Sequence, residues 1–113
     1  MEDRKLLRRH LVYYLRVFDS DTDELIGSVV DITTDGLKLI SDHEFDLDRF
    51  YNARITIPEE TRVSKEIKFK IRSIWSAKDI NPDFFVAGFH AEELADDIKT
   101  KILCLINEFG FKE

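Results

Sequence analysis

The chain has 113 residues and a formal net charge of −6, with four glycines, two prolines and one cysteine. This length predicts one domain with a single core that needs no covalent cross-link. The acidic total argues against binding to DNA or RNA, because binding along a nucleic acid backbone requires a dominant basic surface. The lone Cys104 excludes an internal disulfide and fits a reducing compartment.

The first residues are basic, although the protein as a whole is acidic. Residues 1–18 carry five basic and two acidic residues, whereas residues 19–48 carry one and ten. This distribution favours a small anionic ligand over a nucleic acid. No signal-like apolar segment follows Met1, and no apolar run approaches the ~20 residues that a membrane-spanning helix needs. We therefore expect a cytoplasmic domain with no membrane insertion.

The first part of the chain predicts three strands. Residues 11–18 are rich in β-branched and aromatic types, and the acidic run 19–23 is a turn signal that ends them. Residues 25–32 form the return strand of a hairpin. Asp35-Gly36 then marks a tight reversal, and residues 37–41 continue as the third strand.

Three more strands are predicted in the second part. Residues 42–50 lack alternation and indicate a loop or a short helical turn before the strand 51–57. Residues 67–72 alternate strictly between apolar and basic types, which indicates one buried and one solvated face. The turn 81–83 precedes a sixth strand over residues 84–91. Most aromatic residues of these strands are expected in the core, with Tyr14 and Trp75 as alternative stacking partners for a base.

The last segment changes to helical spacing. Its apolar residues fall on one face, its first turn is acidic at Asp96 and Asp97, and Gly110 follows it; the apolar residues are Ile98, Ile102, Leu105, Ile106 and Phe109. Cys104 is expected as a small buried helix residue. The pattern predicts a mainly β fold: a six-stranded antiparallel β-barrel, residues 11–113, with a C-terminal α-helix over its end or flank. We expect residues 1–10 to form a flexible basic arm.

Two polar clusters bracket the first hairpin and indicate a purine nucleotide site. Arg4 and Arg8 offer two planar forks of donors that suit phosphate oxygens and the acceptor edge of guanine. Asp31 can accept hydrogen bonds from guanine nitrogens, and the Thr33 hydroxyl can bond a phosphate. Gly36 lets the chain turn and a ligand approach closely.

With these motifs the chain resembles the PilZ domain family of bacterial cyclic di-GMP receptors, whose mark is Arg-x-x-x-Arg followed by [Asp/Asn]-x-Ser-x-x-Gly. Arg4 and Arg8 match the first element, Asp31 and Gly36 match the second, and Thr33 stands where the family usually has serine. The resemblance implies a receptor for this second messenger in which the arm closes over guanine and phosphate. Ligand binding would order the arm and alter the interaction with a protein partner of unknown identity.

Two alternatives stay open. Lys5 and Arg9 have the same spacing as Arg4 and Arg8 and give a second register for the arm, although lysine lacks the planar fork. The chain could also be a PilZ-like interaction module for motility, pilus or secretion machinery that does not bind cyclic di-GMP. Either way we expect a monomer or weak dimer.

Catalysis is not expected. His10, His43 and His90 are scattered without zinc-type spacing, and no nucleophile turn or glycine-rich phosphate loop occurs. We therefore predict a protein that is not an enzyme and has no metal or cofactor.

Overall fold

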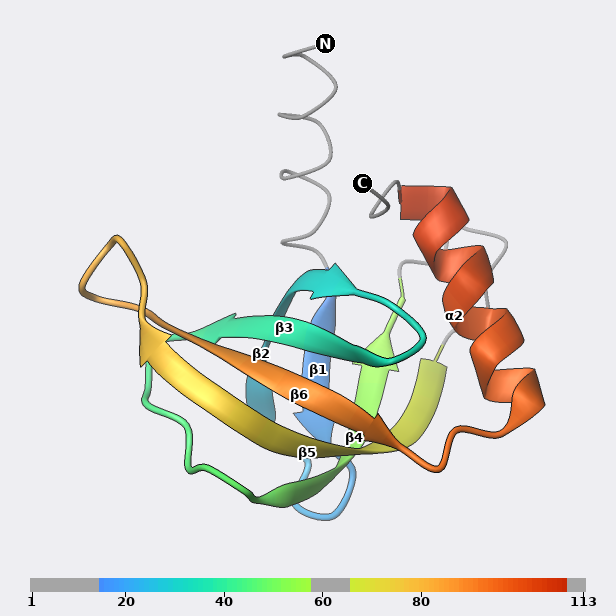
Figure 1. The fold of residues 1–113 in the computed structure, drawn as a ribbon, viewed down its shortest axis with the longest axis horizontal. Helices are drawn as coiled ribbons and strands as arrows, with labels where there is room; N and C mark the ends of the chain where they lie inside the picture. The colour runs from blue at the N-terminus through green and yellow to red at the C-terminus, as the bar shows by residue number, and fades with distance from the viewer. Residues whose placement is uncertain (1–14, 58–65, 110–113) are drawn as a thin grey trace, which may run out of the picture.

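The computed structural model of the chain describes residues 15–57 and 66–109 (Figure 1). The predicted arm over residues 1–10 lies outside the described residues, as do residues 11–14 of the predicted first strand. Gly110, predicted to follow the helix, lies outside them too.

The described strands close into one antiparallel barrel, as predicted. The strands follow one another around it in the order β1-β2-β3-β6-β5-β4, with β4 pairing back onto β1. Their bounds are β1 (Arg16–Asp19), β2 (Leu25–Ile32), β3 (Gly36–Ser41), β4 (Phe50–Thr56), β5 (Glu66–Lys78) and β6 (Phe85–Glu92). Because β6 pairs with both β3 and β5, the first hairpin is joined to the second half of the chain. The segment between β3 and β4 is a loop.

The core of the barrel is mainly aliphatic. Its fully buried side chains come from every strand, and they include Val17, Val29, Leu39, Ile55, Ile67, Ile71 and Ala87. Among the aromatic residues, Phe89 is buried and meets Phe45 edge to face at 5.5 Å between ring centroids. The expectation that most strand aromatics fill the core was wrong for Trp75 and Phe84, which are 43% and 38% exposed.

The helix α2 (Asp96–Phe109) packs one face against the barrel, next to β5 (Figure 1). Ile102 and Leu105 are fully buried in the core cluster, so the predicted amphipathic helix is confirmed. The expectation of a buried Cys104 was wrong: its side chain is exposed, because it lies between the two inward positions rather than on their face. Within the described residues, no helix is long and apolar enough to cross a membrane.

Two leucines of α2 provide a matched test of this packing. Leu105 is fully buried and Leu103 is 56% exposed. We expect Leu105→Ala to lower the free energy of unfolding by about 2–5 kcal/mol, since it leaves a cavity in the core. Leu103→Ala should change it by no more than about 0.5 kcal/mol. Urea denaturation measures both, and equal effects would show that α2 does not pack with this face inward.

Candidate functional site

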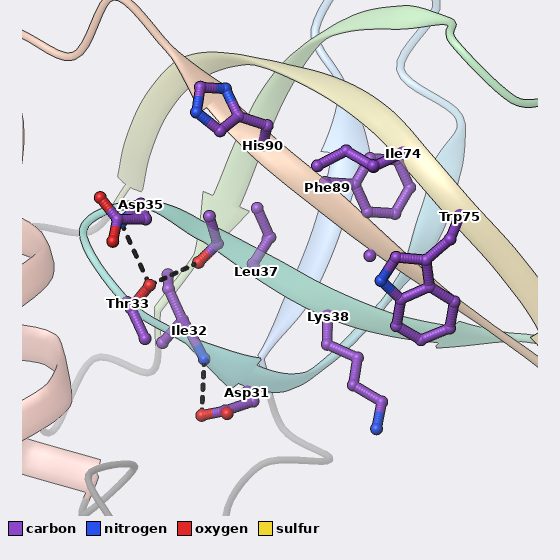
Figure 2. Close-up of a pocket in the computed structure, with 12 residues that line it drawn as sticks. Asp31, Ile32, Thr33, Asp35, Leu37, Lys38, Ile74, Trp75, Phe89 and His90 are labelled. Carbon is purple, nitrogen blue, oxygen red and sulfur yellow. Dashed lines mark hydrogen bonds between the residues drawn. The ribbon is translucent and has the colours of Figure 1, made fainter.

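The turn between β2 and β3 holds the second predicted cluster. The Thr33 backbone N–H donates to the Gly36 carbonyl at 2.8 Å, which closes the turn. The Thr33 hydroxyl accepts from the Asp35 N–H at 3.1 Å and lies 3.5 Å from the Gly36 carbonyl (Figure 2). A 3.5 Å contact is a weak hydrogen bond at best. The hydroxyl therefore caps the turn as an acceptor and keeps its proton available for another acceptor.

Gly36 is required by the contact between β3 and β6. A Cβ at this position would lie 2.1 Å from the Phe89 carbonyl oxygen, far inside van der Waals contact. Its backbone does not use the left-handed region, so the expectation that Gly36 serves the reversal by its conformational freedom was wrong. The Ala91 N–H donates to the Asp35 carbonyl at 2.8 Å, and this hydrogen bond also holds the turn against β6.

A bulge in β2 sets the position of Asp31. The β2–β3 register shifts between Val29 and Asp31, and Asp31 then pairs with Lys38 across the hairpin. The Asp31 carboxylate accepts from the Ile32 N–H at 2.9 Å. The Asp31 side chain is exposed, and among the described residues neither Asp31 nor Lys38 takes part in an ion pair. Its remaining lone pairs are open to a ligand that donates hydrogen bonds.

A second bulge, in β5, turns Trp75 outward. The β5–β6 register shifts between Ser73 and Trp75, so Ser73 is buried while both Ile74 and Trp75 are exposed. A β-bulge places an extra residue in one strand and redirects the side chains around it. Trp75 pairs with Gly88, and a Cβ on Gly88 would lie 2.1 Å from the indole Nε1. The missing side chain at position 88 therefore gives the indole its place on the outer face of the barrel.

A charged network holds His90 beside the turn. The His90 Nδ1 lies 2.9 Å from a Glu92 carboxylate oxygen, which also accepts from the Arg72 Nε at 3.3 Å. Arg72 in turn donates to Asp48 at 3.2 Å. With Nδ1–H donating to Glu92, the Nε2 of a neutral His90 is an acceptor. The hydrogen bond from His90, with that from Arg72, keeps the pKa of Glu92 below its ordinary value against the opposing effect of desolvation.

The β2–β3 turn, Trp75 and His90 line one cleft of about 330 Å³ (Figure 2). Three predicted site residues, Asp31, Thr33 and Gly36, all line it. Sequence reasoning did not identify four further lining residues that could meet a ligand: Lys38, Ile74, Gly88 and His90. No local signal marks them, since the barrel register alone brings β3, β5 and β6 together here. Trp75 also lines the cleft, as the stacking alternative requires.

The other predicted site residues are those of the arm. Arg4 and Arg8, and the alternative pair Lys5 and Arg9, lie outside the described residues.

The cleft alone is weakly acidic. Its lining contains the carboxylates of Asp31 and Asp35 and one permanent cation, Lys38. Figure 2 shows the Asp35 carboxylate on the side of the turn away from Trp75 and Lys38. An anionic ligand at this cleft therefore needs positive charge from elsewhere. Among the described residues, no group of three or more potential ligands could hold a metal ion.

Alanine at the two glycines should have different consequences. Gly36→Ala should lower the free energy of unfolding by about 1–3 kcal/mol or more, because the new Cβ meets backbone that cannot move aside. Gly88→Ala should have a smaller effect, because the Trp75 side chain can rotate away. Since Trp75 is the one tryptophan of the chain, its emission maximum should shift in Gly88→Ala. Equal destabilisation with unchanged emission would contradict this account.

The pKa of Glu92 provides a test of the His90 contact. Because the folded-state pKa is lowered, Glu92 stabilises the fold above its unfolded-state pKa, and this contribution is lost as the pH falls through the folded-state value. We expect His90→Ala to raise the pKa of Glu92, measured by NMR titration of its side-chain carboxyl. The matched control is His43→Ala, since His43 contacts Ser41 and Asp42 instead. An unchanged Glu92 pKa in His90→Ala would refute the contact.

Comparison with known proteins finds similarity in structure and not in sequence. No family model matches the chain, and no curated protein matches it. Solved structures are similar to it, two of them at 13% identity and a TM-score of 0.62. MrkH of K. pneumonia in its apo state matches over 82% of this chain and 44% of its own. The Bacillus subtilis inhibitor of motility, MotI/DgrA, matches over 88% of this chain and 48% of its own. The chain thus spans less than half of either neighbour.

Both neighbours are PilZ-domain proteins, and the closed six-stranded barrel fits that fold. The resemblance to the PilZ family that the two motifs indicated is thus confirmed at the level of the fold: this chain has the PilZ fold.

Proposed function

We propose that this chain is a receptor domain for cyclic di-GMP, with no catalytic activity of its own. The observation that carries the proposal is the cleft at the β2–β3 turn. There, Asp31, Thr33 and Gly36 lie together beside the outward-facing ring of Trp75. The motif supports this function through its residue types, and the fold supports it because the barrel register gathers those residues at one cleft.

Each group in the cleft has a role that its chemistry allows. The exposed carboxylate of Asp31 accepts hydrogen bonds from the N1 and N2 donors of guanine. The Thr33 hydroxyl donates to a phosphate oxygen in place of its weak contact with the Gly36 carbonyl. Trp75 offers a ring for base stacking, an interaction worth roughly 1–3 kcal/mol per base. Lys38, 6.0 Å from the centroid of that ring, supplies a cation on the same side of the cleft.

The net charge of the cleft explains why the arm is needed. Two carboxylates against one lysine do not attract a dianion, so Arg4 and Arg8 must supply the missing charge from residues 1–10. Charge-assisted hydrogen bonds are worth about 1.5–3 kcal/mol each, and together they must exceed the entropy lost when the arm is fixed on the ligand. Binding is thereby converted into an ordering of the arm, and the ordered arm changes the surface that a partner protein meets. The structural similarity to MotI, an inhibitor of motility, supports a regulatory function of this kind.

Calorimetry with cyclic di-GMP tests the clamp. We expect the wild-type chain to bind with quenching of Trp75 emission and GTP to bind at least tenfold more weakly, a difference of about 1.4 kcal/mol. Arg8→Ala should abolish measurable binding and leave the far-UV circular dichroism unchanged. Arg16→Ala is the matched control, because it removes the same charge from an exposed position on β1.

The result also separates the receptor from the interaction module. Ligand at a hundred times its dissociation constant should stabilise the wild-type chain by about 2.7 kcal/mol in a melting scan. No stabilisation of the wild-type chain would favour a PilZ-like module that does not bind the nucleotide. Wild-type affinity in Arg8→Ala would refute the clamp while leaving nucleotide binding in place.

A further inference from the structure

A second hollow lies at the opposite end of β3 from the candidate site. In Figure 1 the β2–β3 turn lies at the right of the barrel, whereas the end of β3 and the β5–β6 turn lie together at the left. The start of β2, the end of β3 and the β5–β6 turn enclose a groove of about 500 Å³. We name it the β3-end groove. It shares no lining residue with the cleft beside Trp75.

The groove is flanked by exposed apolar side chains. Leu25 and Phe84 line it and are 47% and 38% exposed, and Ile80, between two lining residues, is fully exposed. Large apolar side chains that are scattered singly on a surface need no explanation, but several around one concavity indicate an interaction site. The glycine at position 27 contributes to the hollow because it has no side chain, and a Cβ there would lie 2.7 Å from the Ile40 carbonyl oxygen.

Hydrogen bonds fix the turn that presents Ile80 and Phe84. The Asp79 N–H donates to the Phe84 carbonyl and the Phe84 N–H donates to the Asn81 carbonyl, both at 3.0 Å. The Asn81 side chain accepts from the Asp83 N–H, also at 3.0 Å. The apolar edge of the groove is therefore ordered before any partner arrives, which lowers the entropy that binding must overcome.

The charge of the groove indicates the kind of partner. Its charged lining residues are Asp42 and Asp79, and no lining residue is basic. Each carboxylate has a long contact of 3.4 Å, Asp42 with the His43 Nδ1 and Asp79 with the Asn81 N–H. Both carboxylates are thus weakly engaged and available to a cation. A second copy of this chain has a net charge of −6 and would complement these carboxylates only through its basic stretches.

We propose that the β3-end groove docks a segment of a partner protein that presents lysine or arginine beside an apolar side chain. The apolar side chain packs against Leu25, Ile80 and Phe84, and the cation lies between Asp42 and Asp79. This surface goes beyond the proposed function, since it needs no nucleotide and no residue of the arm.

A short blocked peptide of alternating lysine and leucine is the probe. Titrated into the isotope-labelled full chain, it should shift the amide signals of Leu25, Ser41 and Phe84 and leave those of Thr33 and Gly36 unchanged. Asp42→Asn with Asp79→Asn should weaken binding roughly fivefold, as expected for two ion pairs at the protein surface.

Three controls separate specific docking from general attraction. Glu93→Gln with Asp97→Asn makes the same change in charge at exposed positions, one before α2 and one in its first turn, and should leave binding unchanged. Ile80→Ser should weaken binding while Ile74→Ser, half-exposed at the other cleft, should not. A peptide with serine in place of leucine should bind at least several-fold more weakly.

The proposal fails if the peptide does not bind or if the shifts map elsewhere. It fails too if the control with Glu93→Gln and Asp97→Asn binds the peptide as weakly as the variant with Asp42→Asn and Asp79→Asn. The same holds if Ile74→Ser binds it as weakly as Ile80→Ser. It also fails if the serine peptide binds equally well. Sedimentation that shows a dimer dispersed by Ile80→Ser would assign the groove to a second copy of this chain and overturn the proposed partner.

Discussion

The architecture depends on how closely the backbones of β3 and β6 approach at Gly36. With a hydrogen in place of a side chain, Gly36 lies against the Phe89 carbonyl, where a Cβ would be 2.1 Å from the oxygen. This approach starts the β3–β6 ladder, which joins the first hairpin to the last strand and closes the barrel. It also fixes the β2–β3 turn beside Trp75, whose indole occupies the space that Gly88 leaves open. Barrel closure and cleft formation are thus one constraint.

Much of the fold could be predicted from the sequence because the local patterns agree with the tertiary structure. Alternation over 67–72 and helical spacing after Asp96 each report which face meets the core, and the structure buries those faces. The exposure of Trp75 is an exception whose cause lies outside its own strand. Period-2 reasoning assigns Trp75 to the core, but the bulge after Ser73 shifts the alternation and exposes it. A bulge depends on pairing with another strand, so the residues of β5 alone do not reveal it.

The candidate site could be predicted only where its residues are close in sequence. Asp31, Thr33 and Gly36 belong to one turn, and the motif indicated all three. Lys38, Gly88 and His90 join them through the register of β3 and β6, which no single segment determines. The motif also indicated Gly36, but the spacing does not show which neighbour excludes a side chain there, and the structure identifies it as the Phe89 carbonyl.

The proposed mechanism assigns the two ends of β3 to different tasks: a nucleotide at Gly36, gripped from outside by the basic arm, and a cationic partner beyond Ser41. The central claim is the clamp, and a distance measurement tests it most directly. In a Cys104→Ser background, a nitroxide label on Asp3→Cys should broaden the amide signals of Thr33 and Gly36 when cyclic di-GMP is added, more than those of Leu25 and Ser41. Turn signals that are the same with and without the ligand, under conditions where calorimetry shows saturation, would contradict the clamp.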